Sequence, residues 1–239
     1  MRKAAGCELS QTGIRGFSDN IINISGQQLE ANRSMSNYID YFLKDKKLSG
    51  IINAEEPLVL ALQPKIYLRL CRSIMGQQLS TKVAAVLYMR FLGIYGGEEP
   101  TAEQIAGTPP ETLRSIGLSN AKASYVHNVA RFVAEQGLDD ETFLTWSDEN
   151  IITHLTSIKG VGRWTVEMLL MFTLAREDVF SVSDLGIQQA MIRLYKLEKL
   201  DKKALLKKMQ QISDKWKPYR TYACLHLWRW KDKPAVKPS

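Results

Sequence analysis

The stretch LTSIKGVGRWTVEMLL, residues 155–170, joins two apolar segments of helical character through Gly160-Val161-Gly162. A glycine inside a helix costs about 1 kcal/mol relative to alanine, so two glycines so close together indicate a turn. We predict that one helix ends near Ser157 and that the next begins near Arg163. Both glycines can adopt φ > 0, and both leave the turn without side-chain bulk.

This turn has two interpretations. A plain connection between two helices explains the glycines by themselves. The second helix, however, begins with unpaired N–H groups at the positive end of its dipole, and bare backbone at that point can bind a phosphate. Lys159 and Arg163 add positive charge and favour the second interpretation. Contacts of this kind position a nucleic-acid backbone without reading its sequence.

The composition of the 239-residue chain is that of a globular protein, with 45% hydrophobic and 24% charged residues. The net charge of +7 permits a nucleic-acid partner without requiring one. Cys7, Cys71 and Cys224 are far apart, so we expect neither a zinc site nor a cysteine-ligated iron–sulfur cluster. No apolar run approaches the length of a membrane span, and the N-terminus lacks the apolar core of a signal peptide.

Helical periodicity dominates the chain after residue 35 and predicts an all-α fold. The predicted helix N-caps are Ser80 or Thr81, Thr101, Ser119 and Ser147. A short helix is expected to begin at Pro110. VFSV, residues 179–182, is the only strand candidate after residue 60.

Three parts are expected along the chain. Residues 1–35 form an N-terminal arm, residues 36–231 form the helical core, and residues 232–239 form a basic tail rich in lysine and proline. Within the core we expect two lobes. Lobe A takes residues 36–75 together with 195–231, and lobe B takes residues 76–194.

Further stretches of the chain carry recognisable motifs. The turn lies in LTSIKGVGRWTVEMLLMFTL (155–174), which is followed by DVFSVSDLGIQQAM (178–191). SIMGQQLSTKVAAVLYMRF (73–91), GLSNAKASYVHNVA (117–130) and WKPYRTYACLHLWRW (216–230) complete the set. Taken in chain order, over roughly residues 35–233, these stretches resemble the helix-hairpin-helix (HhH-GPD) DNA glycosylases, and they are most similar to the 3-methyladenine DNA glycosylase II, or alkylbase, branch. The resemblance implies a two-lobed all-α fold with the active-site cleft between the lobes.

Asp184, in FSVSDLGIQQA, falls on the catalytic aspartate of that family. The pattern alone favours an N-cap, because Ser183 or Asp184 precedes the helical stretch LGIQQAMIRLY. The resemblance implies that the carboxylate stabilises the positive charge that develops when an N-glycosidic bond breaks, and that it orients or deprotonates the attacking water. The two roles are compatible. Asp178, six residues earlier, is expected to be structural, at a helix end or in a salt bridge.

The residue two positions after the second hairpin glycine separates two reaction types. In the bifunctional glycosylase/lyases of this superfamily it is a lysine whose amine forms a Schiff base with the sugar. Here it is Trp164, and neither Lys159 nor Lys122 stands at the matching place. The resemblance therefore implies simple hydrolysis that leaves an abasic site.

The resemblance also assigns residues to a pocket for a base that is flipped out of the duplex. Trp164 and Trp228 match pocket aromatics, whose ring faces attract a positively charged N-alkylated purine. Core packing stays open for Trp228 and for Met168, which is a further pocket candidate. Gln77 and Tyr125 complete the predicted pocket.

Gln78, with Leu79, is expected to fill the gap that the flipped nucleotide leaves in the duplex. The alternative is an ordinary solvent-facing turn, in which Ser80 caps the next helix. The predicted contacts to DNA phosphates are Lys159, Gly160, Val161, Gly162, Arg163, Thr165, Ser119 and Lys122. Lys159 stands where the family usually has proline. Family hairpins often hold a monovalent cation, Na+ or K+, on main-chain carbonyls, which here match Thr156, Ile158 and Val161.

The combined prediction is a monofunctional DNA glycosylase of base excision repair that hydrolyses alkylated purines of the 3-methyladenine and 7-methylguanine type. We expect its partner to be double-stranded DNA with alkylated bases, its state to be monomeric, and no cofactor to be required. It would act in the bacterial nucleoid or the eukaryotic nucleus. Two alternatives remain open: a helix-hairpin-helix glycosylase for another class of lesion, and a non-catalytic DNA-binding module.

Overall fold

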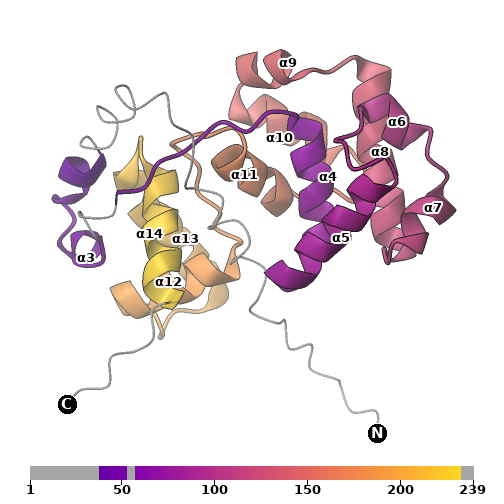
Figure 1. Ribbon diagram of the computed structural model, residues 1–239. Helices are drawn as coiled ribbons and strands as arrows, with labels where there is room; N and C mark the ends of the chain where they lie inside the picture. Colours follow the sequence, from indigo (N-terminus) through magenta and orange to yellow (C-terminus); the bar gives the residue numbers. More distant parts are fainter. Residues whose placement is uncertain (1–37, 53–56, 233–239) are drawn as a thin grey trace, which may run out of the picture. The chain divides into compact units, whose positions relative to one another are not determined.

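The computed structural model describes residues 38–52 and 57–232, which form two compact units (Figure 1). Within these ranges the first unit spans residues 63–169, and the second combines the residues up to Leu62 with residues 170–232. The described residues contain helices and no strand, which confirms the all-α fold. The strand candidate at 179–182 lies in a loop. The predicted N-terminal arm, residues 1–35, lies outside the described residues, and so do residues 233–239 of the predicted basic tail.

The helices of the first unit are consecutive along the chain, whereas the second unit combines α3 with the helices that follow α11. The first unit contains α4 (Ile66–Gly76), α5 (Thr81–Gly93), α6 (Ala102–Ala106), α7 (Pro110–Ser115), α8 (Asn120–Gln136), α9 (Asp140–Thr145) and α10 (Asp148–Thr156). The second contains α3 (Lys46–Ser49), α12 (Leu185–Tyr195), α13 (Lys202–Ser213), the 3-10 helix η2 (Asp214–Trp216) and α14 (Arg220–Asp232). Helix α11 (Arg163–Phe172) begins in the first unit and continues past its last residue, Leu169.

The boundaries of the units differ from the predicted lobes. The prediction placed residues 63–75 in lobe A and residues 170–194 in lobe B. Instead α4 packs against α5 and α8, while α12 packs against α14. The hydrophobic pattern of a helix shows which face is buried but not which helix covers that face, so the sequence did not determine these pairings.

Local capping chemistry sets most helix starts in the first unit. The predicted N-caps are confirmed at Ser80, Thr101, Ser119 and Ser147. In each case the side-chain oxygen accepts a hydrogen bond from the backbone N–H three residues later, an interaction worth about 1 kcal/mol. Gln104 completes a capping box with Thr101, and Pro110 is the first residue of α7 as expected.

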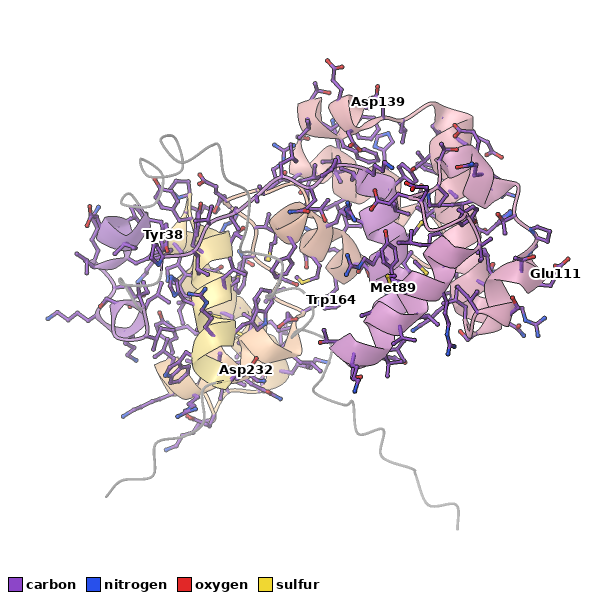
Figure 2. All side chains as sticks on the ribbon, viewed as in Figure 1. Tyr38, Met89, Glu111, Asp139, Trp164 and Asp232 are labelled. Atoms are coloured by element: carbon purple, nitrogen blue, oxygen red, sulfur yellow. The ribbon has the colours of Figure 1, made fainter. Side chains whose placement is uncertain are left out.

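The second unit is built around α14, the yellow helix of Figure 1. Every residue from Thr221 to Trp228 is buried, so this helix has no solvent-facing side over two turns. The ring of Tyr38, labelled in Figure 2, stacks on that of Tyr222 at 4.1 Å between centroids and 8° between planes. Among the described residues no helix has the length and apolar character needed to cross a membrane.

Candidate functional site

The glycine-containing turn has the predicted boundaries. Helix α10 ends at Thr156 with Ser157 as its C-cap, and α11 begins at Arg163. The backbone N–H of Val161 donates to the carbonyl of Ile158 at 3.0 Å and closes the turn. The N–H groups at the start of α11 therefore follow directly on a compact hairpin in which Lys159 and Gly162 are exposed.

The two glycines of the hairpin serve different purposes. Gly160 has φ +103°, and a Cβ added there would overlap the ring of Tyr125, so the chain itself requires glycine at this position. Gly162 is exposed and does not have a positive φ, and a Cβ there would meet no atom of the described chain within 4 Å. Of the two glycines that can adopt φ > 0, only Gly160 does so. The open space at Gly162 leaves the adjacent backbone accessible to an external group.

Helix α8 supports the hairpin from within the same unit. The ring of Tyr125 packs on Gly160, and the side-chain amide of Asn128 donates to the carbonyl of Lys159 at 3.1 Å. This contact gives Tyr125 a supporting role under the hairpin, and its place in a base pocket stays a prediction. The Lys159 side chain is exposed, as expected for a residue that contacts phosphate.

The first turn of α11 carries three of the predicted site residues. The Nε of Arg163 donates to Glu167 Oε1 at 2.9 Å, and the guanidinium also lies 3.7 Å from Glu149 Oε1, yet the side chain stays 59% exposed. Trp164 follows it and is partly exposed (Figure 2). Thr165 is only 3% exposed, and its hydroxyl accepts a hydrogen bond from Gln77 Nε2 at 3.2 Å. The Thr165 side chain is therefore engaged with Gln77 inside the first unit, and its contact with a phosphate stays a prediction.

The turn between α4 and α5 presents Gln78 to solvent. Gln77 is the C-cap of α4, and Gln78 adopts the left-handed conformation with φ +61° and is exposed. Leu79 is half-buried, and its N–H donates to the carbonyl of Gly76 at 3.1 Å. Gln78 therefore occupies the most projecting position of this turn, while Gln77 points back toward Thr165.

The Lys122 side chain contacts the C-terminal end of α4. Its Nζ donates to the carbonyl oxygens of Met75 at 2.9 Å and Gln77 at 2.5 Å, and burial lowers the pKa of the amino group. The amino group is therefore engaged inside the first unit, and its contact with a phosphate stays a prediction. Ser119, also predicted to contact phosphate, is exposed and caps the N-terminus of α8.

In the second unit, Asp184 begins α12 as its N-cap. Its Oδ1 accepts hydrogen bonds from the backbone N–H of Ile187 at 2.8 Å and from the indole Nε1 of Trp228 at 2.9 Å. The residue is 3% exposed. The capping prediction is confirmed, and the carboxylate is held at a helix N-terminus by two N–H groups of fixed direction.

Gly186 makes the contact between Trp228 and Asp184 sterically possible. A Cβ at position 186 would lie 2.9 Å from the indole Nε1, closer than real Cβ atoms approach, and 3.1 Å from Asp184 Oδ1, which is a tight contact. The Trp228 ring is 5% exposed and stacks on Phe172, with 5.7 Å between centroids and 26° between planes. The indole therefore meets the carboxylate with its edge. Met168, the remaining pocket candidate, is 2% exposed, which fits its alternative as a core residue.

The loop that leads to Asp184 is attached to the start of α14. Arg220 donates to Asp178 through Nε at 2.6 Å to Oδ1 and through Nη2 at 3.0 Å to Oδ2. The Thr221 hydroxyl donates to the carbonyl of Arg176 at 2.6 Å and accepts the N–H of Val179 at 3.0 Å. Asp178 is thus a salt-bridge residue, as predicted. The sequence did not reveal Arg220, Thr221 or Gly186, because their partners lie far along the chain or depend on close backbone approach.

Comparisons with known proteins place this geometry in a family. Residues 71–218 match the family model described as HhH-GPD superfamily base excision DNA repair protein. The chain is 35% identical to DNA-3-methyladenine glycosylase 1 of Schizosaccharomyces pombe, over 77% of this chain and 80% of that protein.

Two solved structures extend the comparison to three dimensions. A DNA-3-methyladenine glycosidase from Bacillus halodurans superposes with a TM-score of 0.70 at 32% identity, covering 89% of this chain and 92% of the other. The 3-methyladenine DNA glycosylase Mag1 of Schizosaccharomyces pombe, in complex with abasic DNA, superposes with a TM-score of 0.68 at 31% identity, covering 81% and 95%. The similarity therefore spans nearly all of each compared structure.

Proposed function

The chain belongs to the HhH-GPD superfamily of base excision DNA repair proteins, and we propose that it is a DNA glycosylase that removes alkylated purines from DNA by hydrolysis. Relatives named DNA-3-methyladenine glycosylase support the alkylated purine as substrate. The observation that carries the proposal is Asp184. It is a buried carboxylate whose Oδ1 is fixed by two N–H donors at the start of α12.

The proposed chemistry needs a carboxylate in a defined place. When the N-glycosidic bond breaks, positive charge develops on the sugar, and a fixed negative group nearby lowers the energy of that transition state. The same carboxylate can orient a water molecule or accept its proton. An alkylated purine already carries positive charge and is a good leaving group, so the protein need not protonate it. Asp184, held by Ile187 and Trp228, is suited to both tasks.

In this proposal the hairpin is the DNA anchor. The N–H groups before α11 and the open space at Gly162 allow a phosphate to approach the backbone closely. Lys159, exposed beside them, adds a positive charge. The relative Mag1 was solved with abasic DNA, which supports DNA as the partner. Main-chain carbonyls of Thr156, Ile158 and Val161 remain the proposed site for Na+ or K+, since hard cations prefer oxygen ligands.

We propose hydrolysis without strand cleavage because Trp164 stands where a lyase of this superfamily carries lysine. An indole cannot attack the sugar, so no Schiff base forms at that position. Incubation with abasic DNA and borohydride should therefore leave no covalent protein–DNA adduct. A trapped adduct would contradict this part of the proposal.

The test is release of free base from a panel of duplexes. The panel carries 3-methyladenine, 7-methylguanine, hypoxanthine or 8-oxoguanine at one position. We expect release of the two methylated purines, and loss of release by at least about 100-fold in Asp184→Asn, the scale of removing one electrostatic group from an active site. The control is Asp201→Asn. Asp201 caps α13 as Asp184 caps α12, and asparagine caps equally well.

The panel also separates the two alternatives. A glycosylase for another lesion class would release hypoxanthine or 8-oxoguanine and leave the methylated purines in place. A non-catalytic DNA-binding module would release no base at all, and Asp184→Asn would bind DNA as the wild type does. If Asp184→Asn and Asp201→Asn release methylated purines at the same rate as wild type, the role of Asp184 is refuted.

A further inference from the structure

The turn between α4 and α5 holds a backbone conformation that its sequence does not favour. Gln78 has φ +61°, a left-handed conformation that residues with a Cβ rarely adopt. The turn also follows directly on the C-terminus of α4, where carbonyl oxygens lack partners within the helix. Such a conformation persists only when surrounding contacts hold it in place.

Two side chains from other helices supply those contacts. Lys122 of α8 donates its amino group to the carbonyls of Met75 and Gln77, on both sides of the end of α4. A positively charged group at a helix C-terminus also interacts favourably with the negative end of the helix dipole. From α11, the Thr165 hydroxyl accepts the side-chain amide of Gln77. The residue before Gln78 is thus fixed through both its backbone and its side chain.

We propose that Lys122 is a positioning residue that holds the Gln77–Leu79 turn in the shape from which Gln78 enters the DNA duplex, and that it does not bind phosphate. The inference rests on the proposed function, since it concerns how that function's turn is held. The same face of α8 carries Tyr125 and Asn128, three and six residues later, which support the hairpin. One helix face therefore sets the distance between the turn and the hairpin within the first unit.

The salt dependence of DNA binding distinguishes a positioning lysine from a lysine that contacts phosphate. A phosphate-binding lysine releases a counterion, so its loss weakens binding to all duplexes and reduces the salt dependence of binding by about one unit of slope. A positioning lysine contributes no phosphate contact. Its loss should leave the salt slope unchanged and should impair only the step in which the nucleotide is flipped.

The experiment compares three single substitutions, each of which removes one positive charge. Lys122→Met removes the contact to the turn, Lys159→Met removes the exposed hairpin lysine, and Arg131→Met is the control. Arg131 lies on α8, is 61% exposed and pairs with Glu135 four residues on, so its loss should change neither readout. Flipping is measured in an Asp184→Asn background, so that no base is lost. The probe is a duplex with 7-methylguanine beside 2-aminopurine, whose fluorescence rises when its neighbour leaves the stack.

We expect Lys122→Met to reduce the flipping signal and the single-turnover release of 7-methylguanine at least tenfold, with the salt slope of wild type. Lys159→Met should lower the salt slope. A reduced salt slope in Lys122→Met, or flipping equal to wild type, would overturn the inference. Failure of the proposed function looks different, because then the wild type itself would release no base.

A second measurement on the wild-type protein covers the case in which Lys122→Met does not fold. Lysine acetylation is followed residue by residue by mass spectrometry, with and without duplex DNA. Lys122 should react at least tenfold more slowly than Lys159 in the free protein, because its amino group is engaged with two carbonyls. DNA should protect Lys159 and leave the rate at Lys122 unchanged. Fast acetylation of Lys122 that DNA suppresses would identify it as a phosphate ligand and refute the proposal.

Discussion

Replacement of Trp228 by phenylalanine tests whether the indole N–H holds the carboxylate of Asp184. The substitution keeps an aromatic ring at the position that stacks on Phe172 and removes the donor that lies 2.9 Å from Asp184 Oδ1. Both partners are buried, with 5% and 3% of their surface exposed. Water therefore does not readily replace the lost donor.

The magnitude follows from the environment of this bond. A hydrogen bond to a charged group contributes about 1.5–3 kcal/mol, and removal of its buried donor costs a similar amount. The smaller ring leaves a gap that adds roughly 1 kcal/mol. We expect Trp228→Phe to lower the free energy of unfolding by about 2–4 kcal/mol. If the hydrogen bond stabilises the transition state of base release by this 1.5–3 kcal/mol, its loss lowers the rate by about 10- to 150-fold, since 1.36 kcal/mol corresponds to a factor of ten.

The assay is single-turnover release of 7-methylguanine at saturating protein, with urea unfolding measured in parallel. The matched control is Trp230→Phe. Trp230 lies on the same helix, and its ring faces the guanidinium of Arg193 at 4.4 Å. A Trp228→Phe protein that is folded and as fast as wild type would refute the positioning role of the N–H. It would instead favour the predicted role of Trp228 as a ring that stacks on the base, because phenylalanine preserves a ring face.

Three further predictions concern the hairpin, the second unit and the loop before the candidate catalytic residue. In urea titrations Gly160→Ala should lower the free energy of unfolding by more than about 2 kcal/mol, because position 160 has a positive φ and a Cβ there overlaps Tyr125, while Gly162→Ala should stay within about 0.5 kcal/mol of wild type. Gly162→Ala should weaken DNA binding measured by fluorescence anisotropy, and equal losses of stability in the two variants would contradict the distinction. Burial raises the pKa of Asp45, but hydrogen bonds from Leu48, Tyr195, Trp216 and Lys47 outweigh this effect and lower the pKa, so the carboxylate stabilises the fold above about pH 4 and this stabilisation disappears as the pH falls through the folded pKa. In urea titrations Asp45→Ala should therefore lower the free energy of unfolding by about 1–3 kcal/mol at neutral pH and by much less near pH 2. A loss of stability that does not change with pH would be inconsistent with this reasoning. Arg220→Met removes the two hydrogen bonds to the Asp178 carboxylate and should lower the free energy of unfolding by about 1–3 kcal/mol and slow base release in a single-turnover assay. An unchanged rate would show that the loop before Asp184 is held without Arg220.

The sequence by itself determined where α5, α6, α8 and α10 begin and where the hairpin lies. Ser119 caps α8 by bonding to a backbone N–H only three residues away, so the information for that helix start is contained in a few neighbouring residues. The hairpin is similar, because the conformational freedom of Gly160 is local. Asp184 was likewise identified as a cap from the residues that follow it. Its assignment as the catalytic residue needed the resemblance to a family.

Only the tertiary structure decided which distant groups meet these local features. The indole of Trp228 reaches Asp184 across 44 residues, and the amino group of Lys122 reaches Met75 across 47. Both contacts depend on which helices pack together, and a hydrophobic stripe does not specify the helix that covers it. The necessity of Gly186 likewise arises from the approach of an indole on another helix. Helix caps and turns are determined by a few neighbouring residues. The orientation of the Asp184 carboxylate and the conformation of the Gln77–Leu79 turn depend instead on packing between segments far apart in the chain.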